Sequence, residues 1–450
     1  MSGESIREIK KLFRLALPIV AVNLGLSTYG LVDIWVAGKA SPEILAGVGA
    51  GSNFLFLVAI FAIGLNNALD TFVSQADGAG DIQKVRDLAT QGVWTAFFVS
   101  FLLLPLFYFL VHYYKDWVKP SPEVEPHVIA YIKIVMWEIP ALCIGNALLR
   151  YWQARSIVAP TVVAIWVSNL FNLIGNFILV LGWGGWFPPM GATGAAISTV
   201  IAVHVTLVIL TVYTLYTFHK NSNLPIRMKK PNWNLIRNLL KIGIPSGLHF
   251  QLEVAAFALS TTLITRLGAL PTAIHQISLS CASLMFMIPM GLSTAAAVRV
   301  GNHLGRNNPL QSERSGWVAL GMGATTATIG ALIFLIFGES IFKIFSNDPA
   351  VIQGGLGIIW IVAGFQIFDS TQAIAAGALR GAGNTTAALF YNLIGHYPIG
   401  MALSIYLCFY TPMKVQGYWL GLAAGLFFVS INLVWKWKTL WKSHNLIKIT

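Results

Sequence analysis

The sequence has few charged residues: they make up only 10% of its 450 residues, whereas 56% are hydrophobic and the mean hydropathy is +0.70. Soluble domains carry roughly 25% charged residues. A chain with so few charged residues cannot cover its surface with side chains that bind water, which excludes an ordinary soluble globular protein. The composition therefore predicts a protein with many membrane-spanning segments.

Cysteine is scarce as well, with three residues, Cys143, Cys281 and Cys408, each inside an apolar stretch. No CxxC pair occurs, so the sequence offers neither a disulfide framework nor a cysteine metal site. The phosphate-binding pattern GxxxxGK[ST] is absent too, so ATP is not expected to power this chain directly. No cofactor is expected.

Acidic residues are fewer than basic ones, 17 against 29, for a formal net charge of +12. Such an excess could indicate a nucleic-acid partner. In a membrane protein it more simply indicates basic loops that face the anionic cytoplasmic leaflet. We therefore expect membrane lipids, and no nucleic acid, as partners.

Long apolar runs dominate the rest of the chain. A helix needs about 20 mostly apolar residues to cross the hydrocarbon layer. With that length the sequence divides into twelve predicted spans: 13–37, 44–70, 88–113, 129–150, 160–181, 190–217, 239–266, 272–298, 315–337, 351–378, 386–409 and 416–437.

The basic residues give the predicted orientation. With the N-terminus inside, 22 Lys and Arg fall in inner segments and 6 in outer ones. Cytoplasmic loops carry the excess of positive charge, so both ends are expected in the cytoplasm. The first apolar run lacks a cleavage site and is expected to remain as a span of a multi-pass cell-membrane protein.

The two halves of the chain form an internal repeat. A shift of 227 positions aligns them without gaps over a long stretch, and six spans per half predict two bundles with the same topology. We expect domains at 1–217 and 241–450 joined by a cytoplasmic linker, 218–240, with a central cleft between the bundles. A duplication that serves packing alone is the alternative. The matching pairs include Pro18 with Pro245, Ala46 with Ala273, Gly64 with Gly291, Ala68 with Ala295, Val73 with Val300, Gly78 with Gly305 and Gly194 with Gly421.

Three acids inside the spans are not copied by the repeat. Asp33 aligns with Ser260, and Glu253 and Asp369 align with leucines. A charged side chain in mid-membrane costs about 2.5–3.5 kcal/mol on insertion scales. Because the fold does not require these carboxyl groups, we interpret them as binding sites for a proton or a cation.

A second polar group lies in the first half. Asn172 and Asn176 are four residues apart and share one helix face, and Thr199 lies in the next span. With Asp33 they would supply the hard oxygen ligands that an alkali ion prefers. The alternative is that these polar side chains only bond helices together.

Five segments carry a resemblance to a known family. They are LALPIVAVNLGLSTYGLVDIWVAGK, ALDTFVSQADGAGD, GLHFQLEVAAFAL, AIHQISLSCASLMFMIPMGLSTAAAVRVGNHLGR and ALRGAGNT. In this order they resemble the multidrug and toxic compound extrusion (MATE) antiporters, most of all the NorM-like branch. The resemblance covers nearly the whole chain. It implies an all-α membrane protein whose twelve helices form two six-helix bundles in a V, and an exchange of Na⁺ or H⁺ for bulky organic cations.

The resemblance also implies roles for single residues. Asp33, Asn172, Asn176 and Thr199 match a cation site of the first half, with Asn176 where some relatives have Asp. Glu253 and Asp369 match the acidic pair of the second half. The resemblance places His275 and Gln276 in the cleft, and Pro18 where the first helix can bend.

Several other polar and aromatic side chains lie inside the predicted spans. Lys133 and Glu138 are unusual inside a span, and at five residues apart they are poorly placed to pair, so Glu138 could reach the cleft.

Phe54 and Phe286, together with Asn53, are expected to line the cleft, where aromatic rings can stack on cationic drugs. His204, His249 and His396 are expected to be core histidines.

These expectations lead to an antiporter that acts as a monomer and is not an enzyme. A flippase for lipid-linked oligosaccharides is the nearest alternative, although such a cleft typically carries basic residues for pyrophosphate. A membrane transferase would need a polar loop with a catalytic cluster, and the longest linker carries bases and no acid. A channel remains a further alternative.

Overall fold

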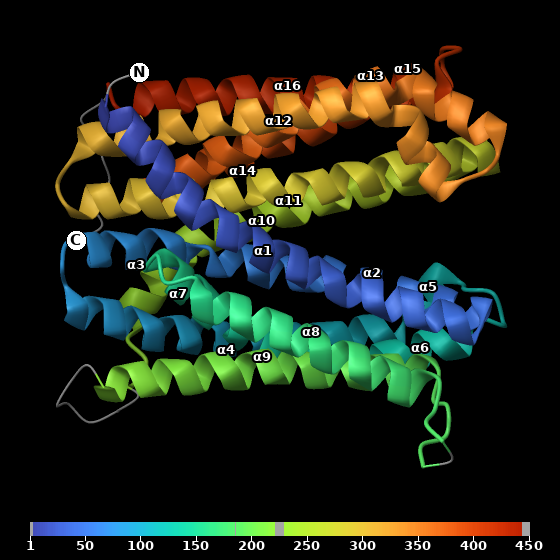
Figure 1. Cartoon of the computed structure of the whole chain (residues 1–450), viewed down its shortest axis with the longest axis horizontal. Helices are drawn as coiled ribbons and strands as arrows, with labels where there is room; N and C mark the ends of the chain where they lie inside the picture. Colours follow the sequence, from blue (N-terminus) through green and yellow to red (C-terminus); the bar gives the residue numbers. More distant parts are fainter. Residues whose placement is uncertain (1–2, 185, 221–228, 443–450) are drawn as a thin grey trace. The chain divides into compact units, whose positions relative to one another are not determined.

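The computed structural model describes residues 3–184, 186–220 and 229–442, and nearly all of them are helical (Figure 1). Within these ranges no strand occurs, and the only extended pairing is an isolated bridge between Trp183 and Phe187. Residues 221–228 of the expected linker lie outside the described residues, as do Arg227 and Lys448 among the basic residues counted on the inner side.

The described residues of the first half contain nine α-helices and one short 3₁₀ segment, η1. Their bounds are α1 Gly3–Ala40, α2 Pro42–Asn66, α3 Ala68–Gly78, α4 Ile82–His112, α5 Tyr114–Val118, α6 Glu125–Val135, η1 Met136–Glu138, α7 Ile139–Ala154, α8 Ala159–Val180 and α9 Ala192–Lys220.

In the second half, the part that the structure describes contains seven α-helices, a 3₁₀ segment (η2) and a π-helical segment (η3). Their bounds are α10 Trp233–Ile264, η2 Thr265–Leu267, α11 Ala269–Gly305, α12 Pro309–Phe345, α13 Pro349–Gly381, α14 Thr386–Ile394, η3 Gly395–Met401, α15 Ala402–Phe409 and α16 Lys414–Leu440.

Eleven helical segments of the described chain are long and apolar enough to cross a membrane. The remaining predicted span, 386–409, is helical from end to end but consists of α14, η3 and α15, none of which reaches 18 residues. Pro398 lies in the π-helical part, where its missing N–H leaves a backbone carbonyl without its usual partner. The prediction of an all-α protein built from membrane-length helices is confirmed.

Several of these helices begin with the same local signal. A polar side chain just before the helix accepts a hydrogen bond from a backbone N–H of the first turn, and a proline occupies the first helical position. This signal starts α2, α12 and α13, at Ser41–Pro42, Asn308–Pro309 and Asp348–Pro349.

The contacts divide the chain into two compact units. Unit 1 comprises Met1–Val20, Ser74–Gly80 and Leu248–Thr450, and unit 2 comprises Ala21–Val73 and Asp81–Gly247. The division falls inside α1 after Val20 and inside α10 after Gly247, positions that are 227 residues apart and each two residues past a repeated proline. The expected domain limits at 217 and 241 stay a prediction.

Repeated glycines allow close helix contacts in both halves. A Cβ at Gly194 of α9 would lie 2.5 Å from the Leu179 carbonyl of α8, and one at Gly421 of α16 would lie 2.3 Å from the Ser404 nitrogen of α15. Helices in lipid associate largely by such close packing of small residues. The repeat therefore preserves the residues that set helix spacing.

Within unit 1, α13 packs against α11, α12 and α16, and within unit 2, α8 packs along α9 (Figure 1). These helices carry most of the polar side chains discussed below. Large apolar side chains such as Phe101, Leu102 and Ile336 are exposed on the outside, as expected of a surface that faces lipid tails.

Candidate functional site

Asp33 of α1 lies at the centre of a polar cluster inside unit 2. Its carboxylate is only 1% exposed. The amides of Asn172 and Asn176 on α8 donate to Oδ1 over 3.0 and 2.7 Å, and the Thr199 hydroxyl on α9 donates to Oδ2 over 2.6 Å. The Tyr131 hydroxyl of α6 adds a longer bond of 3.4 Å. The structure thus brings together the four residues predicted for this site.

Local packing explains why these side chains meet. Asn172 and Asn176 are one turn apart on α8, so both face the same neighbour. Gly175 lies between them, and a Cβ there would be 2.5 Å from the Ser198 hydroxyl oxygen. This close approach of α8 and α9 brings Thr199 within reach of Asp33, and Ser198 donates to the Asn172 carbonyl over 2.7 Å.

The cluster has features that fit a small cation. Two buried amide oxygens, Oδ1 of Asn172 and Oδ1 of Asn176, have no hydrogen-bond partner. Together with the carboxylate and the Thr199 hydroxyl they form a set of hard oxygen ligands suited to Na⁺. In the arrangement seen, the donors instead face Asp33 and stabilise its negative charge.

A second acidic cluster lies inside unit 1. Glu253 of α10 and Asp369 of α13 are both buried, and both accept from the same side-chain amide, Nε2 of Gln372, over 3.0 and 3.4 Å. Nε2 of His249 lies 3.6 Å from Oε2 of Glu253. The predicted acidic pair is therefore brought together around one amide.

His249 is the basic side chain that the described residues place beside these acids, at Glu253. In the described parts of the chain, no Lys or Arg forms an ion pair with Asp33, Glu253 or Asp369. Two carboxylates that share one amide donor repel each other when both are charged. Each cluster can therefore gain stability by taking up a proton or a metal cation.

Among the described contacts, none joins the other predicted site residues to the three acids. His275 is buried in the core of unit 1, bonded to the Thr261 hydroxyl over 3.1 Å and packed against Trp419. Gln276 beside it is exposed and Phe286 is half-buried. The assignment of these residues to a drug-binding cleft stays a prediction.

In unit 2, Asn53 is exposed on α2, and Phe54 packs against Phe107 and Tyr114. Pro18 lies inside α1, which continues as one helix on both sides of it. The predicted bend at Pro18 and the predicted cleft position of Asn53 are not tested by this arrangement.

Sequence reasoning missed several members of both clusters. Gln372 follows Asp369 by three residues, and His249 precedes Glu253 by four, so helical spacing could have identified both. Tyr131 is 98 residues from Asp33 and left no such signal. The core position expected for His204 is wrong, because its side chain is exposed on α9 and its ring bonds back to the Val200 carbonyl.

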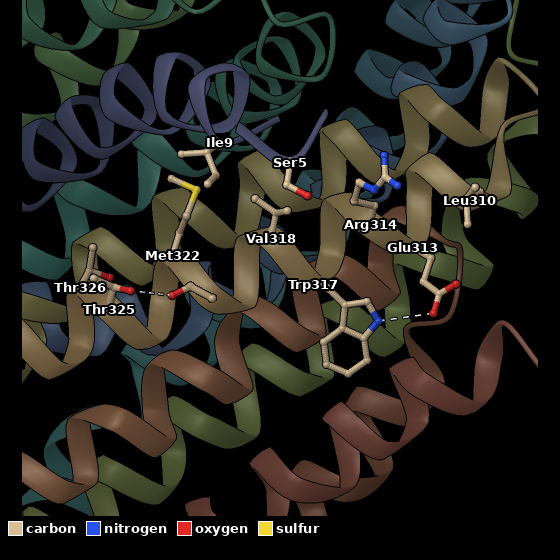
Figure 2. Close-up of a pocket in the computed structure, with 11 residues that line it drawn as sticks. Ser5, Ile9, Leu310, Glu313, Arg314, Trp317, Val318, Met322, Thr325 and Thr326 are labelled. Atoms are coloured by element: carbon tan, nitrogen blue, oxygen red, sulfur yellow. Dashed lines mark hydrogen bonds between the residues drawn. The ribbon is translucent and has the colours of Figure 1, made fainter. Parts of the chain in front are cut away.

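A surface groove lies elsewhere in unit 1, along α12 and the start of α1 (Figure 2). It has a volume of about 810 Å³ and is lined mainly by apolar side chains such as Ile9, Val318 and Met322. Trp317 donates to Glu313 at its edge over 3.4 Å. None of the predicted site residues lines this groove.

The fold and the two clusters define a class: a multi-pass α-helical membrane protein with an internal repeat and buried carboxyl groups. Residues 18–178 and 245–406 each match the MatE family model. The chain belongs to the MatE family, as its motifs predicted. The two matched segments begin 227 residues apart, in agreement with the offset of the internal repeat.

Named relatives are similar over nearly their whole length. The chain is 29% identical to "Multidrug resistance protein MdtK" of Yersinia pseudotuberculosis over 437 residues, which cover 95% of both chains. It is 28% identical to "Probable multidrug resistance protein NorM" of Neisseria meningitidis serogroup B over 431 residues, which cover 96% of this chain and 94% of the relative.

Solved structures share the fold at lower sequence identity. The eukaryotic MATE transporter AtDTX14 superposes with a TM-score of 0.87 at 23% identity, covering 97% of this chain and 98% of that one. A MOP superfamily transporter from Pyrococcus furiosus gives a TM-score of 0.88 at 16% identity, with coverages of 97% and 96%. These similarities establish the fold.

Proposed function

We propose that this protein is a cation-coupled secondary antiporter that exports organic, often cationic and amphipathic, compounds from the cell. Two relatives of nearly the same length carry multidrug resistance names, which supports efflux of small molecules. The eleven membrane-length segments support a multi-pass position in the cell membrane.

The observation that carries the proposal is the pair of buried acidic clusters. One lies in each unit, none of their acids is copied by the repeat, and none forms an ion pair with a Lys or Arg side chain in the described structure. Carboxyl groups inside membrane proteins usually belong to ion pathways or proton relays. Both clusters are therefore suited to bind Na⁺ or H⁺, and no further cofactor is proposed.

The mechanism follows from charge. A cation bound at Asp33, or at Glu253 and Asp369, removes the negative charge that would attract a cationic drug. The drug then leaves on the outside, and after the change of conformation the cation leaves to the cytoplasm and a new drug molecule binds. Coupling of this kind requires each ligand to bind the two conformations with different affinity.

The acids also favour this function over the flippase alternative. A pyrophosphate carries negative charge and would be repelled by Asp33, Glu253 and Asp369. We further propose that the protein acts as a monomer, with both termini in the cytoplasm, and that it has no catalytic activity. The substrates proposed are therefore organic cations.

The decisive experiment is transport by the purified protein in proteoliposomes. Ethidium loaded inside is expected to leave when an opposing Na⁺ gradient or pH gradient is applied, each in turn with the other ion balanced. The double variant Asp33→Asn/Asp369→Asn should lose this efflux. Efflux that is absent with both gradients, or unchanged in the double variant, would overturn the proposal.

A further inference from the structure

Glu138 occupies an irregular point between two helices of unit 2. The 3₁₀ segment η1 separates α6 from α7, and the Ile139 N–H closes it by bonding to the Met136 carbonyl. Pro140 follows at once, and a proline has no N–H to bond to the carbonyl four residues before it. The backbone therefore tightens here, and Glu138 is its last residue.

The Glu138 side chain is buried, and one of its two carboxyl oxygens lacks the hydrogen-bond partner that a charged carboxylate needs. It is only 3% exposed, and its Oε2 atom has no hydrogen-bond partner. By contrast, Asp33 accepts four hydrogen bonds. An ion that has lost its water without gaining such bonds is strongly destabilised.

The ionisable groups that act on this position are few. Glu138 lies within electrostatic range of Asp33 and of the Tyr29 and Tyr131 hydroxyls. The helices packed against η1 are α4, α6, α7 and α9. Of the other ionisable side chains on these helices, His112, Lys133 and His204 are exposed, and Arg150 lies twelve residues further along α7.

Negative charges on both Asp33 and Glu138 would repel each other in a medium of low polarity. The hydrogen bonds decide which carboxyl group carries the charge. Asp33 receives its donors from α6, α8 and α9, whereas the described contacts of Glu138 supply none to Oε2. The pair therefore favours one charge, on Asp33.

We propose that Glu138 is a second proton-binding group of the Asp33 site, which holds a proton while Asp33 is charged. When a cation neutralises Asp33, the O–H bond of Glu138 can break, its proton passes to water, and the negative charge remains on Glu138. Binding of the coupling cation would then release a proton from the same unit. This inference rests on the proposed function only in taking Asp33 to bind that cation.

Infrared spectroscopy of the purified protein tests the first half of this proposal without transport. A protonated carboxyl group has a carbonyl stretching band that neither a carboxylate nor an amide shares. At neutral pH the difference between wild type and Glu138→Gln should show the loss of one such band. The control Glu123→Gln, in an exposed turn before α6, should leave the spectrum unchanged.

A second comparison tests the link to Asp33. In Asp33→Asn the negative charge that holds the Glu138 proton is gone, so the same band should disappear at a lower pH than in wild type. If Glu138→Gln loses no band, or if the pH at which the band disappears is the same in Asp33→Asn, the proposal is wrong. Failure of the antiporter proposal would show instead as absent ethidium efflux with these bands still present.

Glu138→Gln keeps the size of the side chain, and correct folding is checked by its elution as a single species in detergent. If this variant aggregates, Glu138→Asp replaces it. The shorter carboxyl group should retain a protonated band with a shifted frequency, and an absent band would again contradict the proposal.

Discussion

Single acidic residues carry the chemistry of this protein. Asp33, Glu253 and Asp369 are each buried in a helix where the related position of the other half is uncharged. Each gains hydrogen bonds from neutral side chains only, since amides and hydroxyls surround them. Such an environment keeps a carboxyl group available to an incoming cation, because no fixed positive charge competes for it.

Replacing Asp369 by Asn tests whether this buried carboxyl group binds the coupling cation. The variant should lose drug resistance in a drug-sensitive bacterial host while its amount in the membrane persists, because Asn is the same size but cannot bind a proton or carry charge. Growth on toxic organic cations measures the effect. Glu339→Gln, an exposed change on α12, is the matched control, and resistance that survives Asp369→Asn would exclude a coupling role for this acid.

At the scale of elements, close contacts between helices depend on glycine. Gly421 places α16 against the backbone of α15, whereas Gly364 of α13 has open space beside it. The same substitution should therefore have opposite consequences at the two positions.

Gly421→Ala should destabilise the protein by about 1–3 kcal/mol, because the added methyl group overlaps backbone atoms of Ser404. Gly364→Ala should be neutral or stabilising by about 0.5–1 kcal/mol, because alanine is the better helix former. Thermal unfolding in detergent measures both. Equal unfolding temperatures for the two variants would argue against the α15–α16 contact described.

A buried ion pair joins the start of α1 to α11. Arg299 donates to both oxygens of Glu8 over 2.8 and 2.7 Å, the Ser315 hydroxyl donates to Glu8 over 2.8 Å, and His303 lies 3.6 Å away. All four side chains are buried in unit 1. This network holds the part of α1 before Val20 against its unit.

Glu8→Ala should therefore cost about 3–5 kcal/mol, because it leaves Arg299 buried without its anion. The control is Glu4→Ala one turn earlier, where the pair with Arg314 is exposed and the expected cost is about 0–1 kcal/mol. Thermal unfolding again provides the measurement. A Glu8 variant as stable as the Glu4 variant would show that the buried network adds no stability.

At the scale of the whole molecule, the distribution of basic residues predicts orientation. Exposed positions are available on both predicted sides: Lys119 in the segment after α5, and Arg306 in the turn after α11. The prediction places the first outside the cell and the second in the cytoplasm.

Cysteine labelling checks this orientation. With the three native cysteines replaced by serine, Lys119→Cys should react with a membrane-impermeant thiol reagent on intact cells. Arg306→Cys should react only after the membrane is opened, because the reagent cannot reach the cytoplasm. The reverse labelling pattern would place both termini outside.

The two clusters show which contacts could be predicted from the sequence and which could not. The grouping of Asp33 with Asn172, Asn176 and Thr199 could be predicted, because polar side chains inside a membrane require hydrogen-bond partners. The two amides, four residues apart on one helix face, can supply them to a buried acid. The approach of Tyr131 to Asp33 could not, since it joins two helices 98 residues apart in the sequence and depends on tertiary packing. The position of Glu138, with its unpartnered Oε2 atom, likewise depends on the 3₁₀ segment before Pro140, which lies within an otherwise ordinary apolar span.

The amino-acid sequence by itself determined the membrane setting, the helical spans, the repeat and the acids that the repeat does not copy. The reason is that the length of an apolar run, and the free-energy cost of a charge inside it, can be read from each segment separately. Only the tertiary structure decided which donors each carboxyl group receives, and that Gln372 lies between Glu253 and Asp369. Most of those contacts join residues about a hundred or more positions apart, from 98 to 166, and helix packing sets their distances.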